Sequence, residues 1–341
     1  MRVGFNPHKD KVQEVSDYFH QIIVPVYIPN QEGYFKDSFE ILKLCLNSLF
    51  ATSHNKTFIT IVNNGSCQLI VNYLNDLFEQ NKIQEVIHTT NIGKLNAISK
   101  GISGNKFSLI TISDSDVLFL TNWQKATYEV FEVFPKAGAV CPTPSSRSLR
   151  TYTANVYWDL FFSKKVKFTD VENPDALSKF AHSVGNVNFY NSIQLKKYLT
   201  ITNKDKKAVV GAGHFVTTYR ASIFDDLQSR YTNYKLGGDS ELKFLDIPVV
   251  KKGFWRLSTS NNYAYHMGNV IEEWMFPEVD QLRKDDNEKT FLISKTKSGS
   301  YFAFFIKSKL FGKFILNKKL MKYFLIWKGL SKEEATNYLI E

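Results

Sequence analysis

Two carboxylates stand one residue apart, at Asp114 and Asp116, in the stretch LITISDSDVLFL that covers residues 109–120. The acids separate two apolar runs, which places them at the end of a buried strand rather than on a polar surface. Two carboxylates this close repel one another unless a cation lies between them. Hard divalent ions such as Mg²⁺ and Mn²⁺ bind carboxylate, water and phosphate oxygens together. The pair is therefore suited to hold a metal with a diphosphate, although an isolated Asp-x-Asp is also common in solvated turns and helix caps.

The first third of the chain alternates short apolar runs with longer segments of helical period, which is typical of βαβ units and a mostly parallel sheet. We predict strands over residues 21–27, 57–62, 84–88 and 107–112. We predict helices between them over residues 37–50, 67–79 and 94–103. Ligands of such sheets bind at the carboxyl ends of the strands. Polar loops follow these strands at residues 63–66, 91–94 and 114–116, and we expect all three to open at one edge of the sheet.

The pattern weakens towards the middle of the chain. A helix is predicted over residues 123–134 and a strand over 138–141, whereas residues 142–207 show no clear period. We interpret this middle region as a less regular, inserted subdomain. Strand periodicity returns at residues 209–215, and helices are predicted over 221–230 and 238–251.

Composition limits the class of protein. The chain has 341 residues, of which 43% are hydrophobic, so it is long and apolar enough to bury a sizeable core. Its three cysteines are far apart, which favours a reducing, cytoplasmic compartment over a disulfide framework. The sequence shows neither a secretory signal nor an apolar run of about 20 residues that could span a membrane. We therefore expect a cytoplasmic protein.

The formal net charge of +10 is concentrated in the C-terminal tail. Residues 291–341 contain ten lysines and three glutamates, and the preceding part of the chain is close to neutral. A nucleic-acid-binding module would instead place Lys and Arg among aromatic residues across the main domain. We therefore expect no nucleic-acid partner.

A series of motifs resembles the inverting nucleotide-sugar glycosyltransferases of the GT-A fold, in particular family two. The segment IIVPVY at residues 22–27 resembles the first strand of that family, and VNNGS at 62–66 resembles its VDDGS motif. NIGKLNAISKG at 91–101 and ISDSDVLF follow in the order of the family. GAGHFVTTYRASIFDDL at 211–227 resembles its acceptor-side segment, and GGDSEL its ED-x-x-L helix start. The resemblance covers approximately residues 21–268. It implies a GT-A, Rossmann-like α/β fold with a mostly parallel central sheet flanked by helices.

The resemblance also implies roles for the residues of the donor site. Four residues would lie around the nucleoside: Pro25, Tyr27, Asn64 and Lys94. Asp114 would face the ribose or the metal, with Ser115 beside it in the nucleotide-sugar site, and Asp116 would bind the metal directly.

Two further roles have structural alternatives. Asp239 would be the general base that deprotonates the acceptor hydroxyl, although an acid there also suits the N-terminus of a helix. His266 would complete the metal site and favour Mn²⁺ over Mg²⁺, or it would be a packed histidine between aromatic residues. His214 is interpreted as an acceptor-site or core residue.

The sequence departs from the family pattern at several positions. Ile28 stands where the family usually has Asn, Asn63 and Asn64 replace acids, and Gly238 replaces the acid before Asp239. These changes bear on the nucleotide more than on the reaction type. We expect a UDP-sugar rather than a GDP-sugar.

The predicted activity is metal-dependent, inverting transfer of a sugar to a hydroxyl of a glycan or lipid-linked acceptor in bacterial surface polysaccharide synthesis. One alternative is a sugar nucleotidyltransferase, which usually carries a Gly-rich phosphate loop with Lys or Arg after the first strand. The segment PNQEGYF does not resemble such a loop. A second alternative is a catalytically inactive, membrane-bound homologue.

We divide the chain into an N-terminal extension (1–20), a nucleotide-sugar-binding half (21–141), an acceptor-binding and catalytic half (142–270) and a basic helical C-terminal region (271–341). In the last, Leu310, Phe314, Met321 and Phe324 can share one face of a basic amphipathic helix. Such a helix either docks on the inner face of an anionic cell membrane or packs on the protein or a second subunit. The first option would make the protein peripheral, and the second allows a homo-oligomer.

Overall fold

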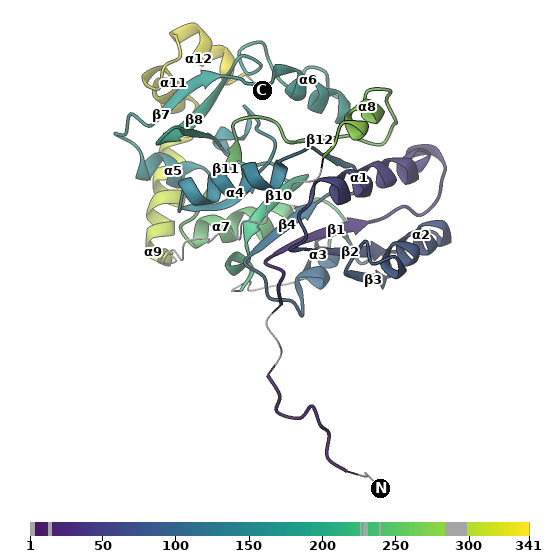
Figure 1. Ribbon diagram of the computed structural model, residues 1–341. Coiled ribbons are helices and arrows are strands. Elements are labelled where there is room, and N and C mark those ends of the chain that lie inside the picture. Colours follow the sequence, from purple (N-terminus) through teal and green to yellow (C-terminus); the bar gives the residue numbers. More distant parts are fainter. Residues whose placement is uncertain are drawn as a thin grey trace.

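The computed structural model describes residues 4–12, 16–225, 227, 231–238, 240–283 and 299–340. The N-terminal half of its main sheet consists of β1 (His20–Val26), β2 (Thr57–Asn64), β3 (Glu85–Thr89) and β4 (Leu109–Ser113). β1 pairs in parallel with β2 and β4, and β2 pairs in parallel with β3. The helices between these strands are α1 (Ser38–Thr52), α2 (Gln68–Glu79) and α3 (Lys94–Ile102) (Figure 1). The predicted strands and helices of this half are confirmed, and each predicted boundary lies within two residues of the observed one.

β1, β2 and β4 are buried on both faces, which explains their apolar runs, whereas β3 lies at the sheet edge and is only partly buried. Ile22 and Val24 of β1 pack in the same core cluster as α1 and α2. Ile23, on the opposite face of the strand, packs with residues of α3. Side chains that alternate along β1 therefore fix helices on both sides of the sheet, and the carboxyl ends of the strands remain for loops.

The second half extends the sheet with strands of both directions. These are β6 (Ala137–Cys141), β7 (Val166–Asp170), β8 (Lys197–Asn203), β9 (Lys206–Val210), β10 (Val216–Arg220) and β11 (Trp255–Thr259). The complete order is β3-β2-β1-β4-β10-β6-β11-β9-β8-β7. β10 runs antiparallel to β4 and β6, β11 runs parallel to β6, and β9, β8 and β7 are antiparallel to their neighbours. Helix α4 (Trp123–Val133) and strand β6 confirm two further predictions.

The middle region is more regular than predicted. Residues 142–207 contain β7, β8, α5 (Ala154–Asp159) and α6 (Pro174–Ser183), and these strands belong to the main sheet. β7 lies at the sheet edge and buries only Val166 fully, so its sequence lacks the apolar alternation that marks a strand. The irregular-subdomain interpretation was therefore wrong.

The strand predicted over residues 209–215 is two strands joined by a loop. β9 ends at Val210 and β10 begins at Val216. Gly211, between them, has a φ of +104°, and a Cβ there would collide with the carbonyl group of Ser148. The position therefore requires glycine, and the chain leaves the first strand there.

Of the two helices predicted over residues 221–230 and 238–251, the first is shorter than expected, whereas the described part of the second is helical over residues 240–251. Ala221–Phe224 forms a 3₁₀ turn, and part of the segment after it lies outside the described residues. A π-helical turn, Leu242–Asp246, leads into α7 (Ile247–Lys251). Pro248 near the start of α7 has no N–H to donate to the preceding turn, which accounts for the irregular hydrogen bonding there.

A two-stranded sheet stands beside the main one. It pairs β5 (Val117–Phe119) with β12 (Ala264–His266) in antiparallel register, with His266 opposite Val117. The N–H of Met267 donates to the carbonyl group of Asp116 over 2.8 Å. This register brings His266 next to the second acid of the DSD segment. Helix α8 (Met275–Asp280) follows β12.

After α8, the described residues 299–340 of the C-terminal region form five short helical segments: α9 (Tyr301–Phe304), the π-helical η5 (Phe305–Leu310), α10 (Phe311–Ile315), α11 (Lys318–Trp327) and α12 (Lys332–Tyr338). Met321 and Phe324 are buried in the second core cluster, whereas Leu310 and Phe314 are exposed. The four residues do not share one face, because the chain turns at Asn317, whose side chain caps α11. α11 packs on the protein.

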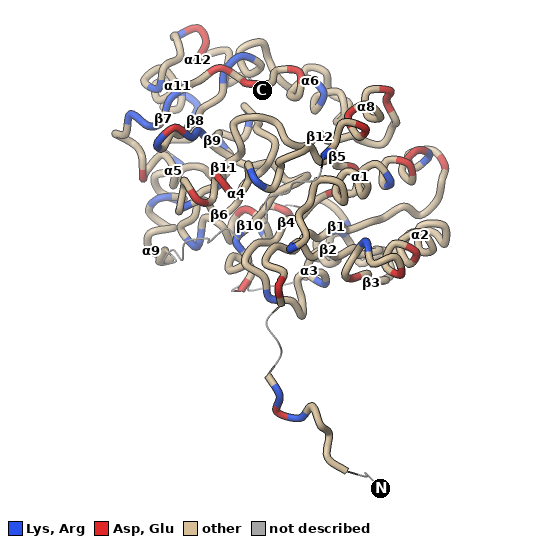
Figure 2. Tube along the Cα trace, in the orientation of Figure 1, with Lys and Arg blue, Asp and Glu red and all other residues tan. Residues whose placement is uncertain are grey.

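Figure 2 shows Lys and Arg residues along β7, β8 and α11, with Asp and Glu residues among them. Within the described residues, no helix is both long and apolar enough to cross a membrane.

Candidate active site

A cavity of about 560 Å³ opens where β1, β2 and β4 end. All seven residues that the sequence predicted for the nucleotide-sugar site and the DSD segment line it: Pro25, Tyr27, Asn64, Lys94, Asp114, Ser115 and Asp116. Residues of all three predicted polar loops thus meet at one edge of the sheet. We refer to this space as the donor cavity.

The amide side chains of the VNNGS segment hold the loops of this edge together. The Oδ1 atom of Asn64 accepts a hydrogen bond of 2.9 Å from the N–H of Ile92 in the neighbouring loop. The Oδ1 atom of Asn63 accepts a bond of 2.9 Å from the N–H of Ser66. The amide oxygens of Asn63 and Asn64 therefore accept the backbone hydrogen bonds that shape this segment, and the carboxylates of the family motif are not needed for that.

Lys94 lies at the centre of an ion-pair cluster. Gly93, with a φ of +92°, makes the turn that starts α3, and the N–H of Lys94 donates to the carbonyl group of Lys235 over 2.9 Å. The Lys94 Nζ atom lies 2.7 Å from Asp114 Oδ1 and 2.9 Å from Glu241 Oε1. Burial alone would lower the pKa of Lys94, but the two carboxylates outweigh it and raise the pKa above its ordinary value. Lys94 is therefore a fixed positive charge that pairs with Asp114.

Asp116 is differently placed. Its side chain keeps 29% of its surface exposed, yet its Oδ1 atom is buried and has no hydrogen-bond partner among the described residues. Its Oδ2 atom lies 3.4 Å from Nε2 of His266. Burial raises the pKa of Asp116 and Asp114 raises it further, while His266 and Lys94 act in the opposite direction. A carboxyl oxygen without a partner in such a place is suited to bind a cation.

His266 is oriented by a second contact. Its Nδ1 atom lies 2.8 Å from the hydroxyl oxygen of Ser183. A neutral imidazole that donates from Nδ1 presents the lone pair of Nε2 towards Asp116, which is how a metal-binding histidine is usually held. The alternative of a packed aromatic contact is also met, because the ring lies against Phe180 and Phe215.

These residues fit a divalent metal that also binds a diphosphate. The described residues contain no group of three or more His, Cys, Asp or Glu side chains that could hold a metal by themselves. Metals in phosphate-transfer sites commonly use one or two carboxylates and take their remaining ligands from water and substrate phosphates. Asp116 and His266 would therefore need further ligands from water and from a phosphorylated donor to hold such a metal.

A buried cluster that was not predicted from the sequence lies beside this site. Asp246 Oδ1 lies 2.8 Å from Arg256 Nη2 and 2.8 Å from His214 Nε2, and the side chains of Asp246 and Arg256 have no exposed surface. The Nδ1 atom of His214 lies 3.6 Å from Glu241. Burial would raise the pKa of Glu241, but Lys94 and His214 lower it below its ordinary value. An arginine inside the apolar strand WRLST was the available signal, because a buried guanidinium needs a buried acid.

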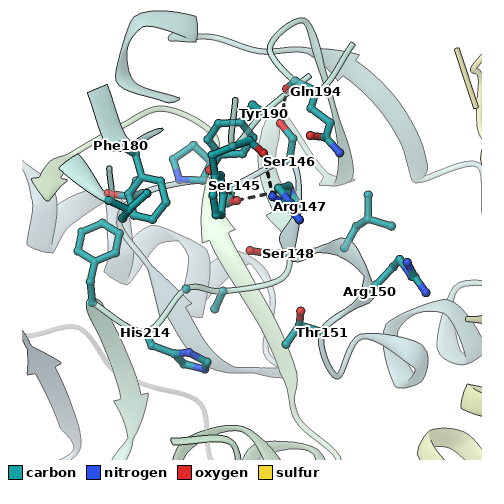
Figure 3. Close-up of a pocket in the computed structure, with 18 of the residues that line it drawn as sticks. Ser145, Ser146, Arg147, Ser148, Arg150, Thr151, Phe180, Tyr190, Gln194 and His214 are labelled. Atoms are coloured by element: carbon teal, nitrogen blue, oxygen red, sulfur yellow. Dashed lines mark hydrogen bonds between the residues drawn. The ribbon is translucent and has the colours of Figure 1, made fainter. Parts of the chain in front are cut away.

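A second cavity, of about 770 Å³, lies next to the donor cavity. His214 and His266 line it, together with a loop after β6 that includes Ser145 and Arg147 (Figure 3). Because His266 also approaches Asp116, the two cavities meet at this pair. We refer to this space as the second cavity.

The predicted base, Asp239, lies outside the described residues. Lys235 and Leu236, which precede it in the sequence, line the donor cavity. The role of Asp239 stays a prediction.

Comparison with known proteins identifies the family. The model of "Glycosyl transferase family 2" matches residues 22–227, which is more than half of the chain. No curated protein matches. Among solved structures, residues 1–349 of TarS from S. aureus in complex with UDP-GlcNAc are 12% identical, with a TM-score of 0.41 over 94% of this chain and 70% of that one. The mannosyltransferase PcManGT from Pyrobaculum calidifontis, in complex with GDP-Man and Mn²⁺, is 12% identical, with a TM-score of 0.43 over 94% and 73%.

The family match agrees with the α/β sheet and with the motif order described above. It displaces the nucleotidyltransferase alternative. This chain belongs to glycosyl transferase family 2, has an α/β fold of the GT-A type and is a glycosyltransferase.

Proposed function

We propose that this protein transfers a sugar with inversion from a nucleotide-sugar donor to an acceptor hydroxyl, and that it uses a divalent metal held by Asp116 and His266. The observation that carries this proposal is the buried Oδ1 atom of Asp116, which has no hydrogen-bond partner among the described residues and lies at the carboxyl end of the sheet beside His266. A metal bound there would neutralise charge on the leaving diphosphate.

The remaining donor-cavity residues would bind and orient the donor. Pro25, Tyr27 and Asn64 line the inner part of the cavity formed by β1 and β2, where the nucleoside would lie. The Tyr27 ring is 41% exposed and packs edge-on against Phe35, so it offers a supported aromatic face to a base. Lys94, which is paired with both Asp114 and Glu241, would hold the Asp114 carboxylate in place beside the donor.

The reaction would be one displacement at the anomeric carbon. The acceptor oxygen forms the new bond while the bond to the diphosphate oxygen breaks on the opposite face, which inverts the configuration. Asp239 would take the proton of the acceptor hydroxyl, as the family resemblance implies. We further propose a UDP-sugar over a GDP-sugar, and Mn²⁺ over Mg²⁺ because a neutral imidazole suits Mn²⁺ better.

The proposal is tested with a panel of UDP- and GDP-sugars, each with Mn²⁺, with Mg²⁺ and with a chelator. We expect hydrolysis or transfer with at least one UDP-sugar, greatest with Mn²⁺ and lost with the chelator. Donor binding is followed in parallel by calorimetry. If no donor is bound or turned over in a metal-dependent way, the proposal is wrong, and the inactive-homologue alternative replaces it.

We also propose that the protein docks on an anionic membrane surface, where a lipid-linked acceptor for surface polysaccharide synthesis would lie. The docking surface would be an aromatic patch of Trp158, Phe162 and Trp327, which are 44%, 88% and 51% exposed. Phe162 and Trp327 are in ring contact at 6.5 Å, and exposed Lys164 follows in the same loop. Exposed aromatic rings beside lysines are typical of surfaces that bind anionic lipid.

Replacing Phe162 and Trp327 together by Ser should weaken co-sedimentation with anionic vesicles at least about ten-fold, because each ring contributes about 1.5–3 kcal/mol on burial. Phe162 is largely exposed and Trp327 is half exposed, and thermal unfolding confirms that the double variant is folded. Phe78→Ser on α2, where the phenylalanine is 46% exposed, is the matched control and should bind as the parent does. Equal binding of the double variant and the parent would show that the patch does not contact lipid.

A further inference from the structure

The second cavity has the position of an acceptor site. His266 lines it and contacts Asp116, which lines the donor cavity, so a molecule in the second cavity would face the proposed metal and diphosphate. His214, on the same wall, is held by the buried Asp246. Its other ring nitrogen is 3.6 Å from Glu241, which pairs with Lys94 of the donor cavity. The two cavities therefore share a rigid wall.

One side of the second cavity is aromatic and carries hydroxyl groups. The ring centres of Phe180 and Phe189 are 5.4 Å apart, and those of Phe189 and Tyr190 are 4.9 Å apart. The hydroxyl groups of Tyr190 and Ser145 are 2.8 Å apart. Figure 3 shows Tyr190, Ser145 and Arg147 close together, with Phe180 beside them. Flat aromatic faces next to hydroxyl groups are suited to a sugar ring, which has an apolar face and a polar rim.

Arg147 gives this wall a positive charge. Its guanidinium carbon lies 4.5 Å from the centre of the Phe189 ring, and its Nη1 atom donates to the carbonyl group of Phe189 over 2.9 Å. Stacking and one hydrogen bond fix the guanidinium plane. Within the part of the chain that the structure describes, Arg147 has no carboxylate within ion-pair distance, in contrast to Lys94 and Arg256.

The described part of the cavity lining agrees with a positively charged wall. Among the described residues, the lining includes Arg147 and no Asp or Glu. The nearby acid on the His214 side, Glu241, is already paired with Lys94. A fixed, half-buried guanidinium in such a lining matches a planar or tetrahedral oxyanion, which can accept two parallel hydrogen bonds.

We propose that the acceptor is an anionic saccharide, and that its carboxylate or phosphate group binds Arg147 while its sugar ring lies on the wall of Phe180, Phe189 and Tyr190. This inference rests on the proposed transfer reaction and names the substrate class of the same site. It makes Arg147 a specificity-determining residue. The donor cavity does not contain it.

The test measures acceptor binding directly, without a donor, by calorimetry on the full chain. Three matched disaccharides are compared: one with a terminal hexuronate, one with a terminal sugar phosphate and one neutral. We expect at least one anionic disaccharide to bind ten-fold or more tightly than the neutral one, and the tighter of the two identifies the anion. Arg147→Ala should remove this preference, and Arg147→Lys should keep part of it, because lysine retains the charge without the fork of donors.

Lys82→Ala, which removes an exposed positive charge after α2, is the matched control and should bind as the parent does. Thermal unfolding confirms that each variant is folded. The inference is overturned if the parent binds all three disaccharides alike, or if the preference persists in Arg147→Ala. Metal-dependent donor hydrolysis, measured on the same preparations, reports on the transfer reaction separately: its absence contradicts the proposed function, whereas loss of the anion preference alone contradicts only the acceptor class.

Discussion

Asp116→Asn is expected to lower the rate of sugar transfer about 10³-fold and to remove its dependence on Mn²⁺. A metal on the leaving diphosphate contributes several kcal/mol to the transition state, and about 4 kcal/mol corresponds to a factor of 10³. Asp116 is the described carboxylate best placed to hold that metal, because Asp114 is engaged by Lys94. An amide is a much weaker ligand than a carboxylate for a hard cation.

Thermal unfolding separates this effect from misfolding. Mn²⁺ with the nucleotide should raise the melting temperature of the parent, since a ligand that binds only the folded state stabilises it. Asp116→Asn should lose that increase. With a chelator present the variant should be at least as stable as the parent, because the substitution removes a charge that burial disfavours and that Asp114 repels.

Asp205→Asn, in the exposed turn between β8 and β9, is the control and should behave as the parent does in both measurements. Mn²⁺-dependent transfer by folded Asp116→Asn, at a rate close to that of the parent, would show that the metal is held elsewhere. A variant that melts well below the parent in the chelator would mean that Asp116 mainly supports the fold.

The donor side of the site could be predicted because local patterns determine it. The apolar runs that end at Asn64 and Asp114 mark strands of one parallel sheet, and the carboxyl ends of parallel strands meet. Lys94 could be placed there because it ends the polar loop 91–94 and because the segment NIGKLNAISKG resembles a motif of the family. His266 could be expected from the family motif, but its approach to Asp116 depends on the register of β5 with β12, which three-residue strands do not reveal in the sequence.

The acceptor side could not be predicted in the same way. Arg147, Phe180 and Tyr190 lie in separate segments of the middle region and meet only in the folded chain. In the edge strand β7, apolar and polar residues alternate only weakly, so the hydrophobic pattern of the sequence did not indicate a strand there. The ion pair of His214 with Asp246 could not be predicted either, because the two residues are far apart in the sequence and no helical or strand pattern connects them.

The C-terminal helices show why a shared helical face was the wrong inference there. A continuous helix over residues 301–330 would have put Leu310 and Met321 on one side. Asn317 ends that continuity by capping a new helix, α11, and Met321 then turns into the core while Leu310 stays exposed. Periodicity assigns faces only within one helix, and a capping residue inside the pattern marks where the assignment must restart.

Asp239→Asn is expected to lower kcat by about 10²–10⁴-fold, which is the usual contribution of a general base. Donor affinity and the Mn²⁺-induced rise in melting temperature should be unchanged, because the predicted role of Asp239 concerns the acceptor hydroxyl and not the diphosphate. Both variants should lose transfer, but Asp239→Asn should keep the Mn²⁺ effect on the melting temperature, whereas Asp116→Asn should lose it.

The pH dependence of kcat gives a second readout. A general base acts only when it is ionised, so kcat of the parent should fall as the pH falls through the pKa of Asp239 in the complex with substrates. The residual rate of Asp239→Asn should lack that acidic limb. Asp280→Asn, at the exposed end of α8, is the matched control and should keep both the rate and the limb.

Two outcomes would contradict the assignment of Asp239, and they point in different directions. Loss of donor binding together with transfer would place the residue among the groups that hold the diphosphate. An unchanged rate would mean that another group takes the proton. The described residue best placed for it is His214, whose Nε2 faces the buried Asp246 while the ring lines the second cavity. In that case the acidic limb should disappear in His214→Gln instead, because the proton would then pass to the Nδ1 side of a ring oriented by a carboxylate.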